Sequence, residues 1–142
     1  GADIAINYKE EDFPESLRAQ NGGKGADVIL DVVGAKYLAQ NVDALADYGR
    51  LVVIGLQGGA KGELDLGKLL SKRAAIIATA LRPRPVEEKT VIMDAVRDAV
   101  WPLLTDGRIR PLVAKTFPLE QVVAAHRYFD SGDHVGKILL VL

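Results

Sequence analysis

The residues with the clearest chemical meaning are glycines that follow two apolar runs. One run, GADVILDVVG, ends at Gly34, and a second, GRLVVIG, ends at Gly55. Apolar runs bounded by glycine are typical of parallel strands buried on both faces. Ligands of such sheets bind at the carboxyl ends of the strands, and a residue without a Cβ lets a ligand approach the backbone. We therefore predict a binding site at Gly34 and Gly55.

The other reactive side chains form no recognisable catalytic group. The chain has no cysteine and two histidines, which argues against thiolate metal sites and histidine clusters. His126 falls on a predicted helix, where a partly buried, hydrogen-bonded histidine is the usual explanation, and His134 falls in a glycine-containing loop. Neither has a serine or cysteine partner at a known spacing. We assign no catalytic residue and no metal ligand.

One run imitates a phosphate-binding loop. Residues 62–69, GELDLGKL, nearly match G-x-x-x-x-G-K-[ST]. Leu69 stands where the motif needs a magnesium-binding hydroxyl, and Leu64 and Leu66 make the run apolar. We interpret it as a loop followed by a helix. The turn G-x-G-x-x-G, which holds dinucleotide phosphates, precedes neither apolar strand.

The elements that must position the two glycines alternate between strand and helix, which predicts a parallel sheet. Asp12 indicates a helix start, and apolar residues at 38, 42 and 45 indicate a helix capped by Gly49. Leucines at 66, 69 and 70 indicate a short helix. The expected strands are residues 2–7, 28–33, 51–54 and 74–81.

The RPRP turn at residues 82–85 divides the chain, because proline continues neither a helix nor a strand. We expect one domain over 1–84 and a second segment over 85–142. The second segment should contain a long helix kinked at Pro102, a strand over 112–117, a helix that Pro118 opens and a last strand over 137–142.

Charge and hydropathy limit the class of partner. The net charge is −1 and the basic residues are scattered, so we expect no nucleic-acid or membrane partner. The sequence shows no long apolar run and no secretory leader. We expect small-molecule partners or a second copy of the chain, and a cytoplasmic location.

Several segments together resemble a known family. They are GADIAINY at 1–8, the strand ending at Gly34, GR at 49–50 with GL at 55–56, FPLE at 117–120 with His126, and GKI at 136–138. In this order they resemble the quinone oxidoreductases, the zinc-free, NADPH-using branch of the medium-chain dehydrogenase/reductase superfamily. The resemblance covers the whole chain but only the carboxyl-terminal portion of a family member.

The resemblance implies an α/β fold: an incomplete doubly wound, Rossmann-type parallel sheet that lacks its first two strands, with a helix–strand–helix–strand extension. In the family's strand order 3-2-1-4-5-6, the two missing strands lie between the strands at 2–7 and 28–33. Unpaired buried strand edges are not tolerated in a stable fold. Three outcomes stay open: the 2–7 strand pairs with the 28–33 strand, it leaves the sheet, or a second copy fills the gap.

The resemblance also implies a cofactor site. It places Tyr8 near the adenosine 2'-phosphate of NADPH, where an amphipathic tyrosine at the sheet rim is the structural alternative. It places Val33, Gly34 and Ala35 beside the cofactor's ribose, where a tight turn would need the same glycine.

The remaining matched residues fall in three further segments along the cofactor. By resemblance, the segment along the nicotinamide is Ile54, Gly55, Leu56 and Gln57, and the segment that contacts its carboxamide is Thr79, Ala80 and Leu81. Gly136 and Lys137 match a pair at the cofactor edge. For this pair, a turn and a solvated lysine are the structural alternative.

The function implied is hydride transfer from NADPH to a quinone or enone. Residues 1–84 would be a partial dinucleotide-binding domain, and 85–142 would return to a catalytic domain that this sequence lacks. We therefore expect the chain to be inactive alone, and to form a homodimer through the strand at 74–81. The alternatives are a non-catalytic dimerising α/β module that binds no nucleotide, and a methyltransferase-like sheet.

Overall fold

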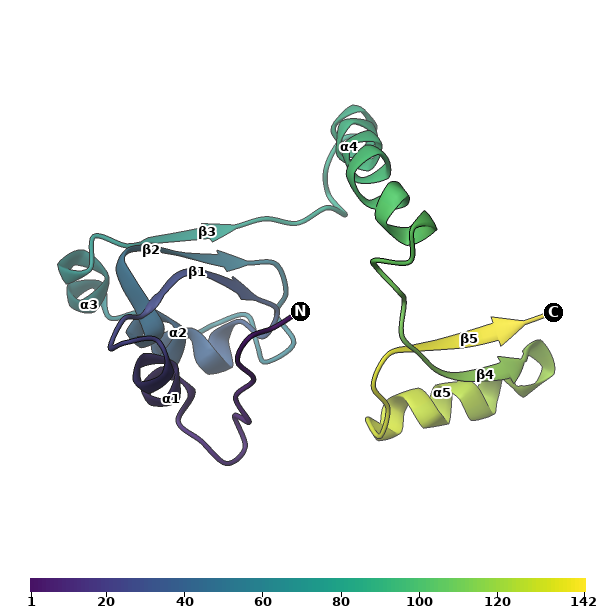
Figure 1. Cartoon of the computed structure of the whole chain (residues 1–142), viewed down its shortest axis with the longest axis horizontal. Helices are drawn as coiled ribbons and strands as arrows, with labels where there is room; N and C mark the ends of the chain where they lie inside the picture. The colour runs from purple at the N-terminus through teal and green to yellow at the C-terminus, as the bar shows by residue number, and fades with distance from the viewer. The chain divides into compact units, whose positions relative to one another are not determined.

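A computed structural model describes all 142 residues, which form two compact units, Gly1–Arg84 and Pro85–Leu142. The first unit holds a parallel three-stranded sheet in the order β1-β2-β3 (Figure 1). Its elements are α1 (Phe13–Gln20), β1 (Ala26–Asp31), a 3-10 turn (Ala35–Tyr37), α2 (Leu38–Ala44), β2 (Leu45–Val53), α3 (Leu66–Ser71) and β3 (Ala75–Ala78).

The core of this unit lies between α2 and the central strand. Leu51, on β2, is fully buried and pairs with Ile29 of β1 and Ile76 of β3. Val42 and Leu45 are buried beside it. Helix α1 packs against α2, and α2 packs against β2. The predicted parallel α/β arrangement is confirmed.

The predicted helix starts follow from capping. The Asp12 carboxylate accepts a hydrogen bond from the Glu15 N–H at 3.0 Å and begins α1. Asp65 does the same for the Lys68 N–H at 3.0 Å and begins α3. Each aspartate satisfies a donor that the first helical turn leaves unpaired.

Residues 2–7, expected to be a strand, pair with no strand. A strand needs a neighbour for its backbone groups, and this segment has none. Of the three outcomes left open, the segment has left the sheet. The β1 edge stays open, with Val28 52% and Leu30 66% exposed.

Several predicted boundaries were wrong. Helix α2 ends at Ala44, because Leu45 is already extended and starts β2. Gly49 is therefore a strand residue and not a helix cap. A Cβ on Gly49 would lie 2.8 Å from the Ala46 carbonyl oxygen and 3.0 Å from that of Ala26, so close contacts within β2 and with β1 together explain this glycine. Strand β3 ends at Ala78, three residues before the predicted end.

The second unit contains α4 (Val86–Thr105), β4 (Val113–Pro118), a 3-10 turn (Leu119–Gln121), α5 (Val122–Ser131) and β5 (Lys137–Val141). Strands β4 and β5 pair in parallel, and α5 contacts both. Phe117 and Ala125 are buried where the helix meets the strands. Helix α4 continues past Pro102 to Thr105.

Candidate functional site

The exits of β1 and β2 are joined by main-chain hydrogen bonds. The N–H groups of Ile54, Gln57 and Gly58 donate to the carbonyls of residues 31, 32 and 33 at 2.8, 3.2 and 2.7 Å. In the other direction, the Ala35 N–H donates to the Gly59 carbonyl at 3.0 Å. Residues 31–35 and 54–59 therefore form one unit, which we call the exit framework.

Asp31 fixes the first half of the exit framework. Its carboxylate accepts hydrogen bonds from the N–H groups of Val33 at 2.8 Å and Gly34 at 2.9 Å. The residue is only 6% exposed. Two hydrogen bonds to a buried carboxylate are among the stronger kind, so they hold the turn in one conformation.

The two glycines are required by the close contact between these turns. Gly34 has φ 81° and ψ −133°, a conformation that side chains disfavour. A Cβ on Gly34 would lie 2.8 Å from the Gly59 carbonyl oxygen, and one on Gly55 would lie 2.7 Å from the Val32 carbonyl oxygen. Packing alone accounts for both glycines, and a ligand role for them stays a prediction.

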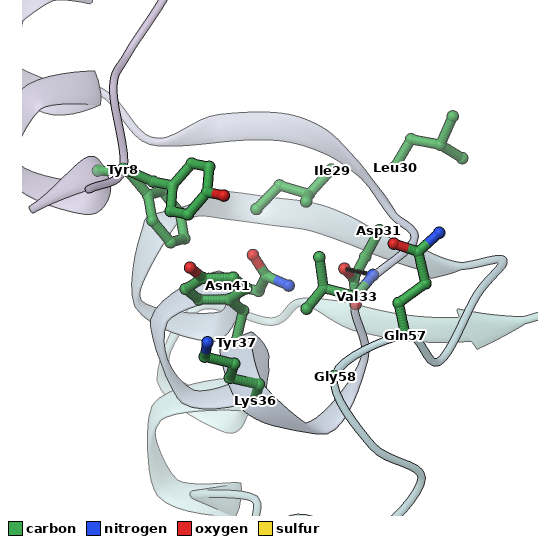
Figure 2. A pocket seen from close by; sticks show the side chains of 11 residues that line it. Tyr8, Ile29, Leu30, Asp31, Val33, Lys36, Tyr37, Asn41, Gln57 and Gly58 are labelled. Carbon is green, nitrogen blue, oxygen red and sulfur yellow. Dashed lines mark hydrogen bonds between the residues drawn. The ribbon is translucent and has the colours of Figure 1, made fainter. Parts of the chain in front are cut away.

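A cavity of about 410 Å³ lies beside β1, and we call it the β1 cavity (Figure 2). One wall of the cavity is aromatic. The Tyr37 ring centroid lies 6.1 Å from that of Tyr8 and 5.9 Å from that of Phe13, and both pairs meet edge to face. Three predicted site residues meet here: Tyr8, Val33 and Gln57. The full lining is Tyr8, Phe13, Ile29, Leu30, Asp31, Val33, Lys36, Tyr37, Asn41, Gln57 and Gly58.

Asn41 is the unusual residue of the β1 cavity. It is 5% exposed, and its Nδ2 has no hydrogen-bond partner. The side chain extends from α2 into the cavity (Figure 2). An unpaired buried amide is costly, which makes it a candidate donor to a ligand. The sequence analysis missed Asn41, although a polar residue next to the buried Val42 was a usable signal.

A second cavity, of about 710 Å³, lies at the ends of β2 and β3, and we call it the β2–β3 cavity. Five predicted site residues line it: Ile54, Gly55, Leu56, Thr79 and Ala80. The other lining residues are Val53, Ala78 and Arg82, of which Arg82 carries the only charge.

The remaining predicted site residues lie elsewhere. Gly34 and Ala35 belong to the exit framework and line neither cavity. Leu81 also lines neither, although its neighbours Ala80 and Arg82 line the β2–β3 cavity. Gly136 and Lys137 belong to the second unit, where the Lys137 N–H donates to the Leu112 carbonyl at 2.7 Å.

Both histidines differ from expectation. His126 is exposed on α5 and not partly buried, and it lines a cavity of about 290 Å³ together with Ile138 and Leu140 of β5. His134 is half-buried and not a solvated turn residue. Its ring centroid lies 5.7 Å from that of Tyr128 and 5.3 Å from that of Phe129.

Charged side chains gather at the opposite, amino ends of the strands. Arg18 Nη1 lies 3.1 Å and Lys68 Nζ 3.4 Å from the Asp43 carboxylate, at the end of α2. Lys72 Nζ donates to the carbonyls of Asp43 and Leu45. Burial alone would raise the pKa of Asp43, but hydrogen bonds and charges from Arg18 and Lys68 outweigh it and lower that pKa. Burial lowers the pKa of Lys72.

None of the helices has the length and apolarity that a bilayer crossing requires.

Comparison with known proteins identifies the family. The sequence model of a family described as zinc-binding dehydrogenase matches residues 1–140. A 2-haloacrylate reductase from Burkholderia sp is 29% identical over 141 residues, which are 99% of this chain and 42% of that protein. A quinone oxidoreductase from Rattus norvegicus is 27% identical over 143 residues, covering 100% of this chain and 42% of that protein. The solved structure of an NAD-dependent alcohol dehydrogenase matches with a TM-score of 0.78 at 28% identity, covering 100% of this chain and 38% of that one.

The chain thus spans about two fifths of the length of the curated relatives that it matches. The family's description names zinc, but the residues of this chain do not fit a zinc site. It has no cysteine, and no group of three or more histidine, aspartate or glutamate side chains could hold a metal ion. The match nevertheless extends over nearly the whole sequence, and the parallel α/β fold agrees with it. The chain belongs to the zinc-binding dehydrogenase family and corresponds to the carboxyl-terminal part of its quinone oxidoreductase-like members.

Proposed function

We propose that this chain forms the cofactor-binding, carboxyl-terminal part of an oxidoreductase that transfers hydride from NADPH to a quinone or enone. The observation that carries the proposal is the exit framework, which places two cavities at the carboxyl ends of a parallel sheet. Such sheets bind their ligands at that end. Quinone oxidoreductase and 2-haloacrylate reductase, the two relatives, act as named on small conjugated molecules, which supports the same class here.

The β2–β3 cavity is where the nicotinamide would bind. Ile54 and Leu56 would supply apolar contacts to the ring, and the main chain at Thr79 and Ala80 would meet the carboxamide. When bound, the nicotinamide supplies the hydride. Reduction also needs a proton, and the lining of this cavity contains no histidine, aspartate or glutamate that could donate one. We assign no general acid to this chain.

The β1 cavity is where the adenosine part would bind. The Asn41 amide would donate to it, and the Tyr8 hydroxyl would lie near the 2'-phosphate that distinguishes NADPH from NADH. Gly34 and Ala35 would lie beside the ribose. Gly136 and Lys137 are assigned to the cofactor edge by resemblance only.

The proposal also covers the division and assembly of the chain. Residues 1–84 would act as the partial dinucleotide-binding domain and 85–142 as the segment that returns to a catalytic domain. Residues 74–81 would form the homodimer contact, since β3 is a sheet edge with Ile77 46% and Leu81 48% exposed. A monomer in sedimentation equilibrium would contradict the homodimer. A cytoplasmic location remains part of the proposal.

Titration with NADPH and NADH tests the cofactor site. We expect NADPH to bind at micromolar concentration by calorimetry, and more tightly than NADH. Tyr8→Phe should weaken NADPH binding and leave NADH binding unchanged. Tyr48→Phe is the matched control, since Tyr48 is exposed on β2 and lines neither cavity. Equal affinity for the two cofactors would contradict the choice of NADPH.

A second candidate is a non-catalytic, dimerising α/β module that binds no nucleotide. The observation in its favour is that packing alone explains Gly34 and Gly55. No binding of either cofactor at millimolar concentration, together with a stable dimer, would favour this candidate.

A further inference from the structure

The two arginines of the turn after β3 have different surroundings. The Arg84 guanidinium donates to the Thr79 hydroxyl at 2.8 Å and to the Ala80 carbonyl at 3.2 Å, so it forms part of the wall behind the β2–β3 cavity. Arg82 lines that cavity, and no hydrogen bond or ion pair joins its side chain to the rest of the chain. The Arg84 guanidinium therefore takes part in the fold, and the Arg82 guanidinium is available to a ligand.

The lining of the β2–β3 cavity offers Arg82 no counter-ion. Valine, isoleucine, leucine, alanine, glycine and threonine make up the rest of it, and no carboxylate is among them. Arg82 itself is exposed, so water competes for its guanidinium and an ion pair there is of modest strength. A guanidinium fork binds a carboxylate through two parallel N–H donors, a geometry that a lysine cannot supply.

We propose that Arg82 binds the carboxylate of the substrate, and that the substrate is an α,β-unsaturated carboxylate. The proposal rests on the proposed function, because it takes the β2–β3 cavity as the place where hydride is transferred. It narrows the substrate from any conjugated acceptor to an anionic one. Arg82 thereby becomes a specificity-determining residue.

The reduction of such a substrate balances with the groups named. The β-carbon takes up the hydride, and the electron pair of the carbon–carbon double bond moves toward the α-carbon and the carboxylate. The α-carbon would then take a proton from solvent, and the two electrons of the hydride would come from the reduced nicotinamide. Negative charge grows on the carboxylate during hydride transfer, and a guanidinium placed there stabilises it.

Binding of a small probe tests this assignment on the chain as it exists. The probes are methacrylate and its neutral isostere methacrylamide, followed by ¹H–¹⁵N NMR. We expect methacrylate to shift the amide signals of Gly55, Leu56 and Thr79 and the Arg82 Nε–H signal. It should bind about three- to fivefold more tightly than methacrylamide, as a partly exposed ion pair allows. Added salt should weaken methacrylate binding only.

Two arginine variants separate a specific contact from general charge. Arg82→Gln should abolish the preference for methacrylate while the rest of the spectrum is unchanged. Arg127→Gln removes an exposed arginine from α5 of the second unit and should keep the preference. A preference that survives Arg82→Gln, or no preference in the unchanged protein, overturns the assignment.

The cofactor titration keeps the two proposals distinguishable. NADPH binding without a methacrylate preference would overturn the role of Arg82 and leave the proposed function in place. A methacrylate preference without NADPH binding would support the carboxylate site and overturn its use in hydride transfer. If inorganic phosphate shifts the same signals more strongly than methacrylate does, Arg82 is a phosphate contact and the substrate assignment is wrong.

Discussion

The two ends of the three-stranded sheet use their polar groups in opposite ways. At the amino ends, Asp43 is paired with Arg18 and Lys68, and Lys72 donates to two carbonyls of the chain. At the carboxyl ends, the amide nitrogen of Asn41 has no partner, and Arg82 makes no ion pair. The fold uses all of these groups at the amino ends. At the carboxyl ends it uses Asp31 and Arg84, and leaves the Asn41 amide nitrogen and the Arg82 guanidinium to a ligand.

The difference follows from where the helices end. Helices α1, α2 and α3 all finish at the amino ends of the strands, and the carbonyls of Asp43 and Leu45, where α2 meets β2, accept hydrogen bonds from basic side chains. Arg18 and Lys72 donate these hydrogen bonds, so the charged side chains at the amino ends stabilise the fold. No helix ends at the exit framework, which is held by main-chain hydrogen bonds and by the Asp31 carboxylate.

The largest expected effect tests the packing of the carboxyl end. Gly34→Val should lower the free energy of unfolding by about 3 kcal/mol, because it combines a disfavoured backbone conformation with contacts to Gly59 and Leu56. Urea denaturation measures the change. Gly22→Val is the matched control: Gly22 also has a positive φ, but nothing lies near its Cβ position, so about 1 kcal/mol is expected. Equal losses would mean that the exit framework is not tightly packed.

The second effect tests the amino end. Lys72→Met keeps the side-chain stem and removes the donor to the Asp43 and Leu45 carbonyls, so stability should fall by about 1.5 kcal/mol in the same assay. Lys61→Met, at an exposed loop position, should change it by less than about 0.3 kcal/mol. A Lys72→Met protein as stable as the unchanged one would show that this donor is not needed.

The third prediction is a gain in stability, and it concerns Asn41. Asn41→Leu removes a buried amide nitrogen that has no partner, so stability should rise by about 1 kcal/mol. Asn21→Leu should instead lower it slightly, because the Asn21 amide donates to the Gly25 carbonyl at 3.3 Å. A loss of stability in Asn41→Leu would mean that Asn41 serves the fold, and the contrast between the two ends would fail.

The smallest effect concerns Asp43. Arg18→Gln should cost less than about 0.5 kcal/mol at pH 7, since both partners are more than a third exposed. The lowered pKa of Asp43 means that the folded state holds the charged form, so the stabilisation is present at neutral pH. It should disappear as the pH falls through that lowered pKa, below about pH 4. Denaturation of the unchanged protein and of Arg18→Gln between pH 7 and pH 2.5 measures the difference in their free energies of unfolding. A difference that grows in acid would contradict the assignment.

The sequence predicted secondary structure best where the signal depends only on residues nearby in the chain. Asp12 predicted the start of α1, and the two apolar runs predicted β1 and β2, because capping and hydropathy are local. The order of motifs predicted the family. Residues 2–7 were misjudged because a strand depends on a partner that local pattern does not reveal.

The candidate site was predicted less completely for the same reason. Gly55 and Leu56 come together with Thr79 and Ala80 as the order of parallel strands required. Its place beside Val42 could have marked Asn41 as a buried polar residue, but the absence of a partner for its amide nitrogen is a property of the packed structure. Arg82 was read only as part of a turn, since its difference from Arg84 depends on which guanidinium reaches Thr79.

The exit framework is built almost entirely from main-chain atoms, which has a practical consequence for protein engineering. The side chains of Ile54, Leu56 and Gln57 take no part in the hydrogen bonds that hold the two turns. A combinatorial library at these three positions could therefore reshape the cavity walls without loosening the turns. Asp31, Gly34 and Gly55 would have to stay fixed.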